Sequence, residues 1–220
     1  MSRQPGLFEQ AAPLRRSKPA AGEVRPCRDS PLLEVPGLPS DIRLGTSSWF
    51  FPGWRGLVYE GVYPQTALSK RGLEAYAQIP LLRTVSLDRT FYAPITTVEY
   101  VRYAHQVPDH FSFVVKAPAL VCDAVTRDEE GRGRVPNPHF LDAGIAAREF
   151  VVPCLEGLQG KAGPLVFQIS PLPRSLVEEA PMLMERLAAF FHALPREFGG
   201  RDRKSTRLNS SHSQQSRMPS

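Results

Sequence analysis

The feature that most limits the possible folds is a repeated order of segments, in which a short apolar stretch is followed by a loop and then by an amphipathic stretch. This order occurs four times between residues 41 and 200. Strands are predicted at residues 42–46, 84–88, 111–116 and 165–169. Helices are predicted at residues 68–78, 97–105, 140–158 and 176–194. Thr96 is the expected cap of the second helix, and Ser175 and Glu178 form an expected capping box for the fourth.

Four successive strand–helix units imply parallel strands joined by right-handed crossovers. Two architectures satisfy this rule, an open doubly wound sheet and a barrel. No glycine-rich phosphate-binding loop follows any predicted strand, which weighs against an open nucleotide-binding sheet. The predicted fold class is therefore α/β, a parallel (β/α) TIM-type barrel of which about the first four β/α units are present.

Composition divides the chain into three expected parts. Residues 1–40 hold seven of the 22 prolines and show no period of 2 or 3.6, so a flexible arm is predicted. Residues 41–200 are expected to form the N-terminal half of the barrel. Residues 201–220 resemble translated sequencing-adaptor read-through and are expected to be a disordered, non-native tail. Since a complete barrel needs about 250 residues, the chain is expected to be truncated at its C-terminus.

Charge and hydropathy restrict the partners of the folded body. The formal net charge is +5, yet residues 41–200 contain 16 basic and 17 acidic side chains, so the basic excess belongs to the two ends. A nucleic-acid groove on the body is therefore not expected. No run of about 18 apolar residues and no signal peptide occur, which predicts a cytoplasmic protein without a membrane segment. The three cysteines and five histidines show no metal-site spacing, and the sequence leaves any cofactor unknown.

Side chains that can perform chemistry follow the ends of the predicted strands, where the active sites of parallel barrels lie. The segment after the first strand carries both tryptophans and an arginine, and each later strand ends at polar or aromatic residues. The candidate residues are Trp49, Trp54, Arg55, Asp88, Arg89, Thr90, Tyr92, Lys116 and Gln168. We expect them to gather at one edge of the sheet.

The same strand ends resemble a known family. The motifs are Gly45-Thr46-Ser47-Ser48-Trp49, Pro52-Gly53-Trp54-Arg55-Gly56, Thr90-Phe91-Tyr92, Val115-Lys116-Ala117-Pro118 and Phe167-Gln168. In this order they look like the YecE-like family, known as domain of unknown function seventy-two. The resemblance covers roughly residues 42–195 and implies a TIM-type barrel whose reaction is not established. Family members typically have Val-Glu-x-Asn in the second strand, whereas here Val85 is followed by Ser86, Leu87 and Asp88.

These residues predict an enzyme that acts on a small anionic or phosphorylated molecule. Asp88 is the candidate general base and Lys116 the candidate electrostatic stabiliser. The remaining candidates, Trp49, Trp54, Arg55, Arg89, Thr90, Tyr92 and Gln168, are expected to bind substrate. Hydrolysis and isomerisation are both compatible with this set, so the reaction class is not assigned. An ion pair between Asp88 and Lys116, and packing of the tryptophans against the barrel, are the structural alternatives.

Two other functions are compatible with the sequence. Gln4, Leu7 and Phe8 lie in a Gln-x-x-Leu-Phe segment that resembles the peptides with which bacterial proteins dock into the sliding clamp. A nucleic-acid-associated accessory protein tethered by this arm is therefore one alternative. The other is a non-functional truncated fragment, because half a barrel leaves sheet edges uncovered.

Overall fold

A computed structural model describes residues 23–34, 39, 41–127 and 133–195 of the chain. Its centre is a four-stranded sheet of β1 (Leu44–Thr46), β2 (Leu82–Leu87), β3 (Ser112–Lys116) and β6 (Ala162–Val166). Several predictions fall outside the described residues: most of the proline-rich arm, the tail at 201–220, and the clamp-binding residues Gln4, Leu7 and Phe8.

The four predicted strands are confirmed, and every neighbouring pair is parallel. Their order in the sheet is β1-β2-β3-β6, which follows the chain without a reversal. In a doubly wound sheet the strand order reverses at a switch point, whereas in a barrel it does not. The described residues therefore form an α/β fold with a parallel sheet flanked by helices, consistent with part of a β/α barrel.

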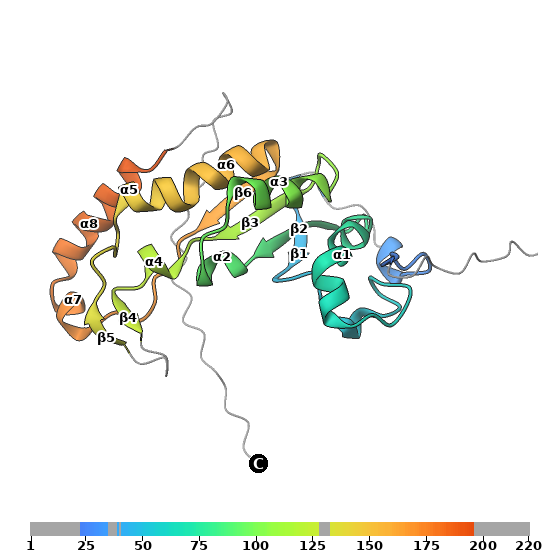
Figure 1. Cartoon of the computed structure of the whole chain (residues 1–220), viewed down its shortest axis with the longest axis horizontal. Coiled ribbons are helices and arrows are strands. Elements are labelled where there is room, and N and C mark those ends of the chain that lie inside the picture. The colour runs from blue at the N-terminus through green and yellow to red at the C-terminus, as the bar shows by residue number, and fades with distance from the viewer. Residues whose placement is uncertain (1–22, 35–38, 40, 128–132, 196–220) are drawn as a thin grey trace, which may run out of the picture.

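Helices connect the strands and lie beside the sheet (Figure 1). They are α1 (Gln65–Ala77), α2 (Arg89–Tyr92), α3 (Thr97–His105), α4 (Ala119–Cys122), α5 (Ala143–Ala146), α6 (Val152–Leu158), α7 (Arg174–Glu178) and α8 (Ala180–Ala193). The helices α3 and α6 run side by side along the sheet. None of the described helices has both the length and the apolar character required to cross a membrane.

One face of the sheet carries the hydrophobic core. Val85, Phe113 and Val115 are each 0% exposed, and they alternate along β2 and β3 with half-buried residues such as Ser86 and Lys116. Mostly apolar parallel strands are usually covered on both faces, but in the described residues only one face is fully buried. The reason is that strands added in sequence by right-handed crossovers place their helices on the same side.

Two predicted helices are interrupted at prolines. The segment predicted as one helix at 140–158 consists of α5, a π-helical turn at Ala147–Val151, and α6. Pro153 lies in the first turn of α6 and has no N–H to bond to the carbonyl four residues earlier, so the α-helical ladder cannot pass through it. The segment predicted at 176–194 is divided into α7 and α8, and Pro181 lies in the first turn of α8.

Two sequence predictions of local structure are wrong. Ser175 does not begin a capping box, because α7 already begins at Arg174 after Pro173. The last strand begins at Ala162 and not at residue 165. It includes Gly163 and Pro164, two residue types that are rare in strands, at a place where the register of β6 with β3 shifts. On either side of residues 128–132, which lie outside the described residues, β4 (Val125–Arg127) and β5 (Gly133–Pro136) pair antiparallel.

Gly157 allows α6 to approach α3 closely, which gives a test of this packing. A Cβ atom at Gly157 would lie 2.4 Å from Tyr100 Cβ and 2.7 Å from the Thr97 carbonyl oxygen. We expect Gly157→Ala to lower the free energy of unfolding by about 1–2 kcal/mol, because overpacking outweighs the gain in helix propensity. Urea denaturation measures the change. Gly160→Ala is the control, since no atom lies within 4 Å of its Cβ position, and equal stability of the two variants would contradict the packing described.

Candidate functional site

The segment after β1 places the two tryptophans differently. Trp49 is 4% exposed, and its ring meets Phe50 at 5.5 Å and Tyr103 at 5.6 Å, edge to face in both cases. The buried hydroxyl of Tyr59 donates a hydrogen bond to the Trp49 carbonyl oxygen and fixes the backbone there. Trp54 is half-buried, with its ring 6.2 Å from that of Tyr76 on α1. Trp49 thus faces α3, and Trp54 packs on α1.

A cavity of about 600 Å³ opens at the C-terminal ends of β1 and β2, between α1 and α3. Its volume is in the range of small-molecule sites. Residues from the loop after β1, from α1, from the end of β2 and from α3 contribute to its wall. They are Ser47, Ser48, Trp49, Phe50, Ser69, Lys70, Ser86, Leu87, Asp88, Arg89, Glu99, Arg102, Tyr103 and Gln106. We call this cavity the strand-end pocket.

The structure brings only part of the predicted site together. Trp49, Asp88 and Arg89 line the strand-end pocket. The other predicted residues, Trp54, Arg55, Thr90, Tyr92, Lys116 and Gln168, do not line it. Thr90 and Tyr92 belong to α2, Lys116 ends β3 and Gln168 follows β6, whereas the pocket lies at the ends of β1 and β2.

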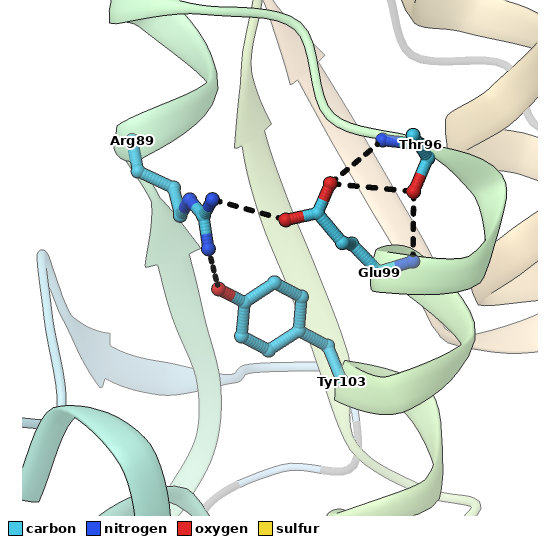
Figure 2. A network of polar contacts seen from close by, with 4 residues as sticks. All are labelled: Arg89, Thr96, Glu99 and Tyr103. Atoms are coloured by element: carbon cyan, nitrogen blue, oxygen red, sulfur yellow. Dashed lines mark hydrogen bonds and ion pairs between the residues drawn. The ribbon is translucent and has the colours of Figure 1, made fainter.

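Arg89 is held in a polar network at the side of the pocket (Figure 2). Its guanidinium donates one hydrogen bond to the Tyr103 hydroxyl at 3.0 Å and another to Glu99 at 3.1 Å. The second carboxylate oxygen of Glu99 accepts a hydrogen bond from the backbone N–H of Thr96 at 3.0 Å. The Thr96 cap predicted from the sequence is therefore confirmed, as a capping box with Glu99.

The network shifts the ionisation of both charged groups toward their charged forms. Hydrogen bonding to Tyr103, followed by the charge of Glu99, raises the pKa of Arg89. The Thr96 backbone N–H, followed by the charge of Arg89, lowers the pKa of Glu99. Arg89 therefore remains cationic and tied to α3, so its position is set by the protein.

Asp88 and Lys116 end neighbouring strands but form no ion pair with each other in the described part of the chain. Asp88 accepts a hydrogen bond from Ser86 at 2.5 Å. The Lys116 ammonium lies over the ring of Phe91, 5.4 Å from its centroid. Thr90 is fully buried, and its hydroxyl lies 2.7 Å from the Leu87 carbonyl oxygen and 2.5 Å from that of Lys116. Thr90 therefore joins the ends of β2 and β3.

Three further predicted residues lie at exposed positions. Tyr92 is 85% exposed, with its ring edge-on to Phe91 at 5.6 Å. Arg55 and Gln168 are also exposed. Their side chains are accessible to a ligand or a partner, although nothing in the described geometry gathers them into a common cavity.

Sequence reasoning missed two cations that line the strand-end pocket, Lys70 on α1 and Arg102 on α3. Both are exposed, and neither forms an ion pair within the described residues. A basic residue on a solvent-facing helical surface is common, so no local pattern distinguishes these two from other surface charges. Only the packing of α1 beside α3 brings them to one cavity.

Burial keeps two of the cysteine thiols in their neutral form. Burial raises the pKa of Cys122 and of Cys154 to about 12 each, so both thiols stay protonated at neutral pH. Over the described ranges, no three His, Cys, Asp or Glu side chains lie close enough together to hold a metal ion.

Comparison with known proteins gives a family without an assigned activity. The family model described as protein of unknown function DUF72 matches residues 43–204. No curated protein matches the chain. Among solved structures, a crystal structure of a DUF72 family protein from Enterococcus faecalis V583 is 17% identical, with a TM-score of 0.42, and the match covers 70% of this chain and 48% of that one. A second crystal structure of the same protein is 19% identical, with a TM-score of 0.37 and coverages of 58% and 46%. The chain thus spans about half the length of these relatives.

The lowered pKa of Glu99 predicts an acid-dependent contribution to stability. A carboxyl whose pKa is lower in the folded state stabilises the fold above its unfolded pKa of about 4.3, and this contribution is lost as the pH falls through the folded value. We expect Glu99→Gln to lower the free energy of unfolding at pH 7 and to have a smaller effect near pH 3. Denaturation at the two pH values measures this, with Glu156→Gln on α6 as the control. An effect of Glu99→Gln that is equal at both pH values would contradict the network.

Proposed function

The chain belongs to the DUF72 family, whose function is unknown, and we propose that it binds a small phosphorylated molecule in the strand-end pocket as the substrate of an enzyme. The observation that carries the proposal is the pair of uncompensated cations, Lys70 and Arg102, on the wall of one cavity. They come from different helices, α1 and α3, and in this proposal a single anion in the pocket interacts with both charges.

The neighbouring acidic groups do not neutralise these cations. Glu99 is already engaged by Arg89 and by the backbone of Thr96. Asp88, the other acid of the pocket, accepts its hydrogen bond from Ser86. Arg89 and Glu99 form an ion pair with each other, so two basic side chains, Lys70 and Arg102, remain against the single carboxylate of Asp88. A cleft with low-dielectric walls increases the attraction of such a charge excess for an anion.

The other side chains of the pocket wall can bind the part of the ligand that carries hydroxyl groups or a ring. Ser47, Ser48 and Ser69 provide hydroxyl groups that both donate and accept hydrogen bonds. Trp49 and Tyr103 provide an apolar aromatic surface in the same cavity. In this proposal the phosphate lies toward Lys70 and Arg102, and the body of the ligand lies against Trp49.

Asp88 is the group placed to exchange a proton with the bound molecule. Its carboxylate is half-buried and lines the pocket, and its hydrogen bond from Ser86 orients it. Lys116 ends the neighbouring strand outside the pocket lining, so in this proposal its charge acts on the site through space and not by contact with the ligand. Hydrolysis and isomerisation both use a carboxylate base of this kind.

Binding is tested by fluorescence of Trp49. Trp54→Phe leaves Trp49 as the single tryptophan, so its emission reports on the strand-end pocket. We expect a saturable change on titration with phosphorylated sugars and nucleoside monophosphates but not with their unphosphorylated counterparts. Loss of one charge-assisted contact should weaken binding about tenfold in Lys70→Ala or Arg102→Ala. The exposed Arg148→Ala, remote from the pocket, is the matched control. Equal affinity in all variants would contradict the proposal.

Turnover is tested separately on the compound that binds most tightly. Phosphorus NMR follows its conversion, and we expect Asp88→Asn to abolish it by removing the proton acceptor. Lys116→Ala should reduce the rate by a smaller factor, at most about tenfold, because the charge of Lys116 acts from outside the pocket lining. If Asp88→Asn keeps the full rate, Asp88 is not the general base. The conclusion from the binding experiment would not change.

A further inference from the structure

A second and larger cavity, of about 840 Å³, lies at the N-terminal ends of β1 and β2. The C-terminal ends of α1 and α3 and the start of the following loop complete its wall. Its residues are Arg43, Glu74, Ala77, Gln78, Pro80, Arg83, His105, Gln106, Val107, Pro108 and His110. We infer that this cavity, the strand-start pocket, binds the oxyanion group of a small molecule through Arg43 and Arg83.

The two arginines have unused hydrogen-bonding capacity. Arg43 is exposed and forms no ion pair or side-chain hydrogen bond within the described ranges. Arg83 is partly buried, and only its Nε donates a bond, at 3.4 Å to the Pro80 carbonyl oxygen. Its two terminal nitrogens remain available. A guanidinium with free terminal N–H groups matches the paired oxygens of a phosphate or a carboxylate.

Acidic groups do not cancel this charge. Glu74 is the single carboxylate among the lining residues, and it lies within ion-pair distance of neither arginine. Asp109 is next to the pocket in sequence, but its carboxylate lies 3.4 Å from the Lys161 ammonium. The lining therefore holds two guanidinium groups against one carboxylate, and the imidazoles of His105 and His110 add further hydrogen-bonding groups.

A purely structural role for basic residues near the C-terminal end of a helix is to stabilise the partial negative charge there. At the end of α3 that task is performed by Lys161, which donates to the Ala104 carbonyl oxygen at 2.8 Å and to that of Val107 at 2.7 Å. The side-chain amide of Gln106 bonds to the Arg102 carbonyl oxygen at 2.9 Å. Since these carbonyl groups are occupied, Arg43 and Arg83 are not needed to satisfy them.

The strand-start pocket stands independently of the proposed function. The two cavities share Gln106, but their charged residues are different: Lys70, Asp88, Arg89, Glu99 and Arg102 line the first, and Arg43, Glu74, Arg83, His105 and His110 line the second. Binding at either one is therefore testable in a protein whose other pocket has been disabled.

The test uses the 220-residue chain with Lys70→Ala and Arg102→Ala, so that the strand-end pocket is disabled. Isothermal titration calorimetry measures binding of pyrophosphate and, separately, of citrate. We expect one of the two to bind at one site, and the one that binds identifies the oxyanion as phosphate or carboxylate. Adding Arg43→Ala or Arg83→Ala should weaken that binding about tenfold.

The control is Arg148→Ala in the same background, which should leave the affinity unchanged. Arg43 is exposed, so its replacement should preserve the fold, and circular dichroism melting verifies this. Absence of binding heat for both probes, or equal affinity with and without Arg43 and Arg83, would overturn the inference. Neither result affects the fluorescence test of the strand-end pocket.

Discussion

The burial of one face of the parallel sheet is the constraint on which the rest of the structure depends. Val85, Leu87, Phe113 and Val115 are completely or almost completely buried, and each leaves water only if helices cover the same side of β2 and β3. Apolar burial is the main driving force of folding, so α1, α3 and α6 must pack on this face. The close approach of α6 to α3 at Gly157 follows from the same requirement.

Packing on one side also creates the two pockets. Residues of α1 and α3 line both cavities, the strand-end pocket at the ends of β1 and β2 and the strand-start pocket at their starts. Asp88 and the segment around Trp49 line the strand-end pocket, and Arg43 and Arg83 line the strand-start pocket. The charged side chains of both cavities thus come from segments distant in sequence.

The polar network at Arg89 shows how capping and site geometry are connected. Thr96 and Glu99 satisfy the first turn of α3, and the same carboxylate holds the guanidinium of Arg89. A residue at the end of β2 is thereby fixed to the helix that follows it. The network stabilises α3 and sets one wall of the strand-end pocket, while Lys70 and Arg102 remain available for an anion.

The sequence by itself determined the order of strands and helices and the Thr96 cap, because these depend on side chains close together along the chain. It also placed Trp49, Asp88 and Arg89 at strand ends. Tertiary structure alone decided that Lys70 and Arg102 share a cavity with them, and that Thr90 is buried between β2 and β3. Those contacts join residues far apart in sequence, and they exist only after α1 and α3 pack on the sheet.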